Sequence, residues 1–531
     1  MLKLSRYIVK IKNGFEVYIM KWKELLNPIK DGMPGIRTSL DTLDYPQDDR
    51  SLFKKDFDTI CNSSCIRRLQ DKAQVFPLEK GDYARTRLTH SIETMSIAES
   101  LGLKAISIIQ RMEGDSIQSD TLALISDIPT ILKSAALLHD VGNPPFGHIG
   151  EDVISKWYED NLHKLVLRYD KTSNSNRLFF TEASLTKQCM AETLTKEQVE
   201  DLLRFDGNAQ VLRVATHLQN SIKNKGMNLT YPLLATLIKY PDNYLKQKSL
   251  SIQRKKRGYF LTEKEEYDKL QRSLCLGGNS HPLTFLLEAS DDISYLVSDI
   301  EDAYKKRLIS LQDIKNAINR VATGSVKEEI APLCQKIETI EKYARRAKTG
   351  DKDAALIQQI RVNLKGFLLS KAGEAFECNY NSIMAGTYTE ELLSNLGTNN
   401  LCKSLKELLT DKVYYCPEIV KTKIEATIIL EKLLEAFVMA VFNVCEEGKH
   451  DDRDTLIYNL MSKNYCAVCN HAINGFKERN NKTLNLTKDE KDKRYRAAFA
   501  YNKLVLARDQ LSGMTDTFAT MTYQTIEALS I

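Results

Sequence analysis

Histidine and aspartate side chains meet at two places in the first third of the chain. His139 and Asp140 are adjacent and follow an apolar helical pattern that Gly142 and Pro144 are expected to stop. His90 opens a second helical pattern about fifty residues earlier. Imidazole and carboxylate donors that arrive on separate helices make a mixed nitrogen and oxygen site, which suits a divalent first-row metal ion.

A third segment supplies further carboxylates. Asp291, Tyr295 and Asp299 are spaced i, i+4 and i+8, so they are expected to lie on one face of a helix. Asp291 is the candidate for the additional metal ligand. A phenol and a second carboxylate on the same face suit contact with a sugar or base and with a hydroxyl group.

Each of these features has an ordinary structural alternative when it is taken alone. A His-Asp pair is often a helix C-cap, and His90 alone could be a buried core histidine. The acidic segment 291–302 could be a solvated helix face. His148 and Glu151, spaced i and i+3, could be an exposed polar pair at a helix start. The order of the segments, a histidine, then His-Asp, then an aspartate, favours a metal-dependent site.

Helical periodicity dominates the rest of the chain, so we expect an all-α, mostly helical fold. The clearest amphipathic pattern is the spacing i, i+3, i+4, i+7, i+8, i+11, i+12 of Leu430, Leu433, Leu434, Phe437, Val438, Val441 and Phe442. We divide the chain into an N-terminal arm (1–45), a catalytic core (46–325) and a C-terminal helical region (326–531). Met20 opens a more polar start, so residues 1–19 could be an upstream-start extension, which N-terminal sequencing of the native protein would test.

The composition limits the class of protein. The 531 residues are 43% hydrophobic and 27% charged, which allows a large buried core. A net charge of +5 is too small for a protein that coats nucleic acid through bulk charge. Eleven cysteines in this length are best explained as free thiols, no uncharged apolar run reaches the length of a membrane span, and no signal peptide is recognised. We therefore expect a cytoplasmic location.

The motifs resemble those of the bacterial deoxyguanosine triphosphate triphosphohydrolases, a family of the HD phosphohydrolase superfamily. The resemblance extends from about Cys61 to about Thr517. Its motifs are RRLQDKAQVFP (67–77), RTRLTHS (85–91), HDVGNPPFGH (139–148), FDGNAQ (205–210), NLTYP (228–232), KRGYF (256–260), EASDDISY (288–295) and SGMTD (512–516).

The resemblance implies a role for each matching residue. It implies that the metal ligands are His90, His139, Asp140 and Asp291, and that the catalytic pair is His148 and Glu151. It implies a substrate-binding set made of Gln74, Arg87, Asn208, Lys239, Tyr240, Lys256, Tyr295 and Asp299. Within that set Gln74 and Tyr295 are expected beside the deoxyribose, and Arg87, Lys239 and Lys256 beside the triphosphate.

The implied reaction is the metal-dependent hydrolysis of dGTP to deoxyguanosine and inorganic triphosphate, with Mg or Mn as the expected ion. The resemblance also implies a homo-oligomer, with hexamers among the usual forms. Two alternatives stay open: an HD-domain phosphohydrolase acting on a different nucleotide, and a nucleotide- or ssDNA-binding regulator. The basic stretch Lys246–Arg257 is a candidate contact for an ssDNA effector. A zinc site at Cys466, Cys469 and His471 lacks a second ligand pair, so we interpret these cysteines as buried free thiols.

Overall fold

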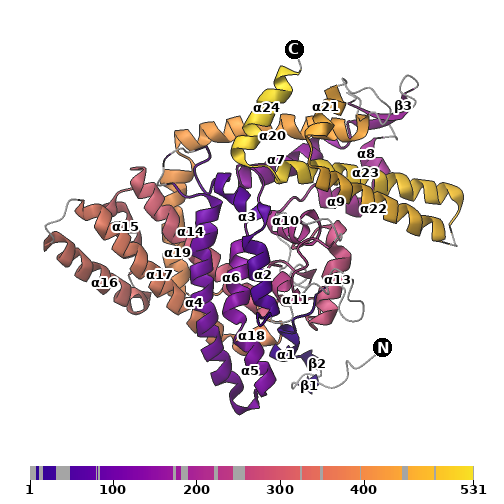
Figure 1. Cartoon of the computed structure of the whole chain (residues 1–531). Coiled ribbons are helices and arrows are strands. Elements are labelled where there is room, and N and C mark those ends of the chain that lie inside the picture. Colours follow the sequence, from indigo (N-terminus) through magenta and orange to yellow (C-terminus); the bar gives the residue numbers. More distant parts are fainter. Residues whose placement is uncertain are drawn as a thin grey trace.

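The protein is described from a computed structural model (Figure 1). The structure describes residues 8–10, 16–30, 48–78, 81, 84–170, 175–180, 189–219, 225–242, 257–322, 326–346, 351–394, 396–444, 453–483 and 486–529. Helices make up most of these residues, as the hydrophobic periodicity predicts.

The helices and strands follow one another along the chain in the order of their labels. The N-terminal half contains β1 (Ile8–Lys10), β2 (Glu16–Tyr18), α1 (Trp22–Leu25), α2 (Leu52–Cys61), α3 (Ser64–Arg68), η2 (Leu69–Asp71), α4 (Arg87–Glu113), η3 (Gly114–Ser116), α5 (Ser119–Ile125), α6 (Ile128–Leu138), α7 (His148–Asn161), β3 (Leu165–Asp170), β4 (Ser175–Phe180), α8 (Met190–Thr193), α9 (Lys196–Leu202), α10 (Gly207–Arg213), η4 (Val214–Leu218), α11 (Tyr231–Thr236), η6 (Leu261–Glu263) and α13 (Lys264–Ser273). The C-terminal half contains α14 (Pro282–Lys305), α15 (Leu311–Val321), α16 (Lys327–Arg346), α17 (Lys352–Cys378), α18 (Tyr380–Met384), α19 (Leu396–Leu409), η8 (Thr410–Tyr414), α20 (Pro417–Asn443), α21 (Arg453–Leu460), α22 (Lys463–Lys482), α23 (Lys488–Ser512) and α24 (Asp516–Ala528).

Three helices, α4, α6 and α14, pack against one another in the middle of the molecule. Thr86 fixes the start of α4 through a capping box, in which its hydroxyl accepts the N–H of Thr89 and its own N–H donates to the Thr89 hydroxyl. The buried residues of α6 include Ile131, Leu132 and Leu138, so this helix carries the core between its neighbours. The packing of these three helices sets the positions of the side chains at their ends.

His281 and Pro282 set the start of α14. The His281 Nδ1 accepts the N–H of Leu283, and Pro282 occupies the first turn, where its missing N–H costs nothing. Burial lowers the pKa of His281 to about 4. His281 is therefore a neutral structural cap rather than a reactive group.

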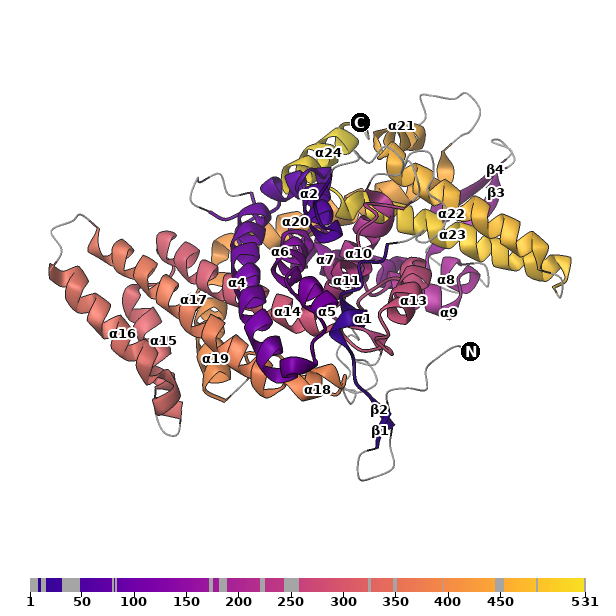
Figure 2. The ribbon, with the colours of Figure 1, turned by 60° about the horizontal axis from the view of Figure 1, so that its bottom comes forward.

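Two outer groups of helices lie on opposite sides of this centre (Figure 1 and Figure 2). The helices α15, α16, α17 and α19 form one group, and the paired α22 and α23 extend on the other side. α20 packs against α7, α23 and α24. The only strand pairs among the described residues are two antiparallel hairpins, β1–β2 and β3–β4.

The expected N-terminal arm is partly core. Trp22, Leu25 and Leu26 are buried, and the indole N–H of Trp22 donates to the hydroxyl of Tyr380 at 2.7 Å. The Pro and Gly residues that suggested an arm lie further along, in a segment that is largely outside the described residues. The expectation that residues 1–45 lie outside the core is therefore wrong for this short segment.

Two composition-based expectations can be compared with the structure. The stretch Ser119–Leu138 is apolar and long enough to count as a membrane-span candidate, although 56% of it is buried. It is divided into α5 and α6, and α6 packs on α4 in the core, as a core helix of a water-exposed protein does. Every cysteine in the described part of the chain is a free thiol.

Candidate functional site

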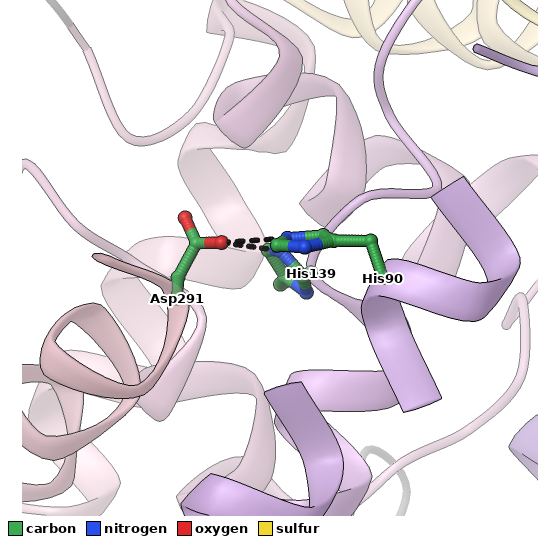
Figure 3. A group of neighbouring side chains, drawn as sticks. All are labelled: His90, His139 and Asp291. Atoms are coloured by element: carbon green, nitrogen blue, oxygen red, sulfur yellow. Dashed lines mark hydrogen bonds and ion pairs between the residues drawn. The ribbon is translucent and has the colours of Figure 1, made fainter. Parts of the chain in front are cut away.

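Three helices bring His90, His139 and Asp291 together (Figure 3). His90 lies in the first turns of α4, His139 follows the last residue of α6, and Asp291 lies in the first half of α14. The Asp291 Oδ1 is 2.9 Å from His90 Nε2 and 3.3 Å from His139 Nε2. One donor atom from each residue lies within 4.8 Å of the other two, so a single ion can contact all three.

The electrostatics of this cluster favour positive charge. Burial lowers the pKa of His139, but the carboxylates of Asp140 and Asp291 outweigh it and raise that pKa to about 9. Burial raises the pKa of Asp291, but His139 and His90 outweigh it and hold that pKa well below its usual range. The cluster is therefore an anionic pocket in which a cation replaces the proton that His139 otherwise keeps.

Asp140, the remaining predicted ligand, lies beside the cluster. Its Oδ1 is 3.6 Å from His139 Nε2 and accepts a hydrogen bond of 2.8 Å from Arg87 Nη1. Its Oδ2 is buried and has no hydrogen-bond partner among the described residues. Arg87 was expected beside the triphosphate, but the structure buries its guanidinium against Asp140.

The donor set fits a divalent ion. His139 Nε2 and Asp140 Oδ2 are both buried atoms that make no hydrogen bond within the described residues, and leaving such atoms unpaired costs roughly 1–3 kcal/mol each. His139 Nδ1 lies 2.6 Å from the carbonyl of Ala136, which fixes the ring and leaves Nε2 as the coordinating atom. Two imidazoles and two carboxylates can hold a first-row divalent ion or Mg²⁺.

The turn from Asp140 to His148 is held by close backbone contacts. At Gly142 a Cβ atom would lie 2.1 Å from the carbonyl oxygen of Gly207, so only glycine allows α10 to approach this closely. Phe146 and Gly147 both have φ of +60°. A Cβ at Gly147 would lie 2.6 Å from Arg87 Nη2, so the guanidinium extends from the candidate metal ligands to the start of α7.

His148 and Glu151 form the predicted pair. His148 Nδ1 lies 2.8 Å from Glu151 Oε2, while the other carboxylate oxygen accepts the N–H of Gly207 at 2.7 Å. The His148 side chain is 82% exposed, whereas Glu151 is largely covered. The carboxylate is thus fixed by α10, and it holds an imidazole that reaches into solvent.

A hydroxyl chain occupies the next turns of α14. Tyr295 donates to the hydroxyl of Tyr414 at 2.6 Å, and Tyr414 donates to Asp299 Oδ2 at 2.7 Å. Burial raises the pKa of Asp299 to about 7, and its Oδ1 has no partner in the described part of the molecule. The predicted i, i+4, i+8 stripe does lie on one helix, and it leaves one acceptor available for a hydroxyl group.

The remaining predicted binding residues surround this region unequally. Lys239 Nζ lies 3.9 Å from Glu288 and 5.7 Å from the ring centre of Tyr240, and Asp291 is close enough to influence its pKa. Burial lowers the pKa of Lys239, but Glu288 and the other neighbouring acidic groups outweigh it and raise that pKa above its usual value. Lys239 is therefore a permanent cation near the cluster.

Asn208 and Gln74 are placed by local structure. Asn208 lies in the first turn of α10, where both its backbone N–H and its amide donate to Asp206 Oδ1 at 2.9 Å. The Gln74 Oε1 is buried without a partner among the described residues. Lys256 lies outside the described residues, as do residues 246–255 of the basic stretch.

Sequence reasoning missed two residues from the C-terminal region. Tyr414 gave no signal, because only tertiary packing brings η8 to α14. Asp516 belongs to the SGMTD motif, but no role was assigned to it. Its carboxylate accepts the N–H of Ala73 at 3.0 Å and that of Phe146 at 2.9 Å. Beside it, the buried Lys72 donates to the carbonyls of Asn143 and Ser512.

Comparisons with known proteins place this geometry among related chains. A family model described as "HD domain" matches residues 87–192, which include His90, the His139–Asp140 pair and His148. A Listeria innocua protein named deoxyguanosinetriphosphate triphosphohydrolase-like protein is 35% identical over 96% of this chain and 100% of its own length. The deoxyguanosinetriphosphate triphosphohydrolase of Salmonella typhimurium is 31% identical over 73% of this chain and 76% of its own length.

Proposed function

The chain belongs to the family of deoxyguanosinetriphosphate triphosphohydrolases and their like-named HD-domain relatives, and we propose that it hydrolyses deoxynucleoside triphosphates. The products are the deoxynucleoside and inorganic triphosphate. Within this class we propose dGTP as the preferred substrate, Mg or Mn as the ion and the cytoplasm as the location.

The observation that carries the proposal is the convergence of His90, His139 and Asp291 from three separate helices. A structural histidine pair does not need a third ligand from a distant helix. The buried, unpaired Nε2 of His139 and Oδ2 of Asp140 add donors that a protein-only arrangement leaves unsatisfied. The same cluster lies next to a fixed His-Glu pair and a hydroxyl-binding carboxylate.

His90, His139, Asp140 and Asp291 are the proposed metal ligands. A divalent ion held there supplies Lewis acidity that offsets phosphoryl charge and acidifies water. The chain's own groups do the remaining work. Arg87, which touches both Asp140 and the turn at Gly147, holds the ligand and the following helix in register.

His148 is the proposed proton donor to the departing 5′-oxygen. Glu151, fixed by the N–H of Gly207, orients the ring through Nδ1 and leaves Nε2 as the atom that carries the proton outward. A positioned general acid contributes typically about 10²–10⁴-fold to the rate. Lys239 and Lys256 are proposed to neutralise the triphosphate, because each is a cation at a position that the family uses for it.

Recognition of the sugar is assigned to α14. Asp299 Oδ1 is the proposed acceptor for the 3′-hydroxyl, since Tyr414 already occupies Oδ2. The Tyr295 ring and Gln74 are proposed to crowd the 2′ position and so exclude ribose. Asn208 and Tyr240 are proposed to line the same pocket, beside Glu151 and Lys239 respectively.

A substrate panel tests the proposal. The protein is incubated with each of the four dNTPs and with GTP, in Mg²⁺ or Mn²⁺, and the products are separated by anion exchange. We expect equal amounts of deoxynucleoside and triphosphate, with dGTP fastest and GTP resistant. Release of pyrophosphate or monophosphate would favour the alternative of an HD phosphohydrolase with a different substrate.

Variants separate binding from chemistry in the same assay. Asp140→Ala is expected to abolish metal binding and turnover together. His148→Ala is expected to keep the metal and to lose most of kcat, because this side chain is exposed and contributes little to the core. If Asp140→Ala still released triphosphate at the wild-type rate, the metal-dependent mechanism would be wrong.

The regulator alternative predicts binding without turnover. A basic stretch at Lys246–Arg257 that grips an ssDNA effector through its phosphates requires an affinity that falls steeply with salt. Fluorescence titration with a single-stranded oligonucleotide at several salt concentrations tests this in the active enzyme. An affinity that does not change with salt removes the effector hypothesis and leaves the hydrolase untouched.

A further inference from the structure

The outward face of α20 is apolar where a surface helix is ordinarily polar. Val420, Ile424 and Ile428 follow one another at i, i+4 and i+8, with 38%, 59% and 49% of their surfaces exposed. The opposite face of the same helix already supplies the core through residues such as Leu430 and Phe437. The exposed stripe is therefore surplus to the needs of folding, and apolar surface of this kind marks an interaction site.

Charged residues flank the stripe in an ordered way. Lys421 lies three residues before Ile424, and Glu431 lies three residues after Ile428, and all four are exposed on the same face. Lys421 has only a loose contact with Glu425, at 3.8 Å, so its ammonium stays largely hydrated. The stripe thus has a positive end and a negative end at equal distances from its centre.

This pattern is complementary to itself. A second α20 laid antiparallel across the first, with a two-fold axis midway between Ile424 and Ile428, places Ile424 against the partner's Ile428. The same rotation places Lys421 against the partner's Glu431, and Glu431 against the partner's Lys421. An isologous interface requires this self-complementarity, whereas an unrelated protein partner has no need of it.

The surface continues beyond α20. The stripe spans eight residues, or about 12 Å of helix, which is too short alone for a standard interface of about 800 Å² per partner. α24 packs against α20 and exposes Phe518 and Met521 (Figure 1). The two helices together supply the additional apolar area that a stable pair needs.

We propose that the exposed face of α20, extended by α24, is where a second copy of this chain docks in an antiparallel two-fold pair. The pairing reaches the candidate site, because α20 begins three residues after Tyr414, whose hydroxyl bonds Asp299. Docking fixes the first turn of α20 and with it the position of Tyr414. This effect on turnover rests on the proposed function, whereas the pairing itself does not.

A charge-swap series with light scattering tests the pairing on the full chain. Wild type is expected to have at least twice the mass of the chain. Ile424→Glu is expected to halve that mass at equal concentration, and Lys421→Glu or Glu431→Lys alone is expected to weaken the pair at least tenfold. The double variant with both charges exchanged restores the pairs and is expected to recover the mass. Leu103→Glu, at a residue 60% exposed on α4, is the matched control and keeps the wild-type mass.

Each other result overturns the proposal. A monomeric wild type would give the face to some other partner, an unchanged mass in Ile424→Glu would place the contact elsewhere, and a double variant that stays weak would refute the antiparallel register. Circular dichroism spectra that match wild type show that the variants are folded. Substrate turnover is measured separately, so a failed hydrolase assay leaves the mass result intact.

Discussion

Replacing Asp516 by asparagine removes a carboxylate that holds two active-site loops from the far end of the chain. One oxygen accepts the N–H of Ala73, next to Gln74, and the other accepts the N–H of Phe146, two residues before His148. An asparagine of the same shape keeps one acceptor oxygen and turns the other into an NH₂ group that faces an N–H. One of the two loops therefore loses its anchor.

The size of the effect follows from these contacts. A hydrogen bond to a charged group contributes about 1.5–3 kcal/mol, but burial raises the pKa of Asp516 and so offsets part of this. We expect the free energy of unfolding to fall by about 1–3 kcal/mol. Phe146 also has φ of +60°, a conformation that costs about 1–2 kcal/mol without support. Its relaxation moves the start of α7, and a displacement of about 1 Å costs roughly 10²-fold in rate.

The assay compares kcat and the urea midpoint in Asp516→Asn and Thr515→Val. Thr515 is the N-cap of the same helix and accepts the N–H of Phe518, so its loss costs about 1 kcal/mol and leaves both loop contacts in place. We expect kcat to fall about 10–100-fold in the first variant and to stay within about twofold in the second. Equal loss of kcat in both would refute the positioning role and leave a merely structural one.

Three further substitutions test other parts of the site. Asp299→Asn should stabilise the protein increasingly as the pH rises from 5 to 8: burial raises the folded-state pKa to about 7, so wild type loses stability as the pH rises through this range while asparagine does not, a difference of up to about 4 kcal/mol in urea unfolding. An equal difference at both pH values would contradict this. Gly147→Ala should lower kcat about tenfold by displacing Arg87, whereas Gly114→Ala, with a similar positive φ but open space, should not; equal losses would show that strain alone matters. Tyr414→Phe should raise KM about tenfold with little change in kcat, because Asp299 loses its donor, and the exposed tyrosine that follows it is the control; an unchanged KM would remove Tyr414 from the sugar pocket.

The sequence was most informative where one element carries several functional groups. A helical period of 3.6 residues was enough to predict that Asp291, Tyr295 and Asp299 share a face, and α14 has that face. The His139–Asp140 pair lies just beyond α6, because Gly142 and the prolines after it end the helix. These predictions depend on local geometry, which sequence spacing records directly.

Contacts between distant elements could not be predicted in this way. Tyr414 meets Asp299 across more than a hundred residues, and Asp516 reaches Phe146 across several hundred. Neither contact leaves a periodic trace in the sequence. The pairing of Arg87 with Asp140 was missed for a related reason, since a basic residue in a phosphate-binding motif reveals its charge and not its partner. Trp22 shows the same limit, because only the folded core shows where it is buried.

Isotope labelling of the products tests the central claim most directly. The protein is incubated with dGTP and Mn²⁺ in H₂¹⁸O, and the deoxyguanosine and the polyphosphate are separated and weighed by mass spectrometry. Attack of water on the α-phosphorus predicts one ¹⁸O atom in each triphosphate and none in deoxyguanosine, with the reaction abolished in a folded Asp291→Asn variant. Label in the nucleoside, release of pyrophosphate, or full turnover by that variant would contradict the account.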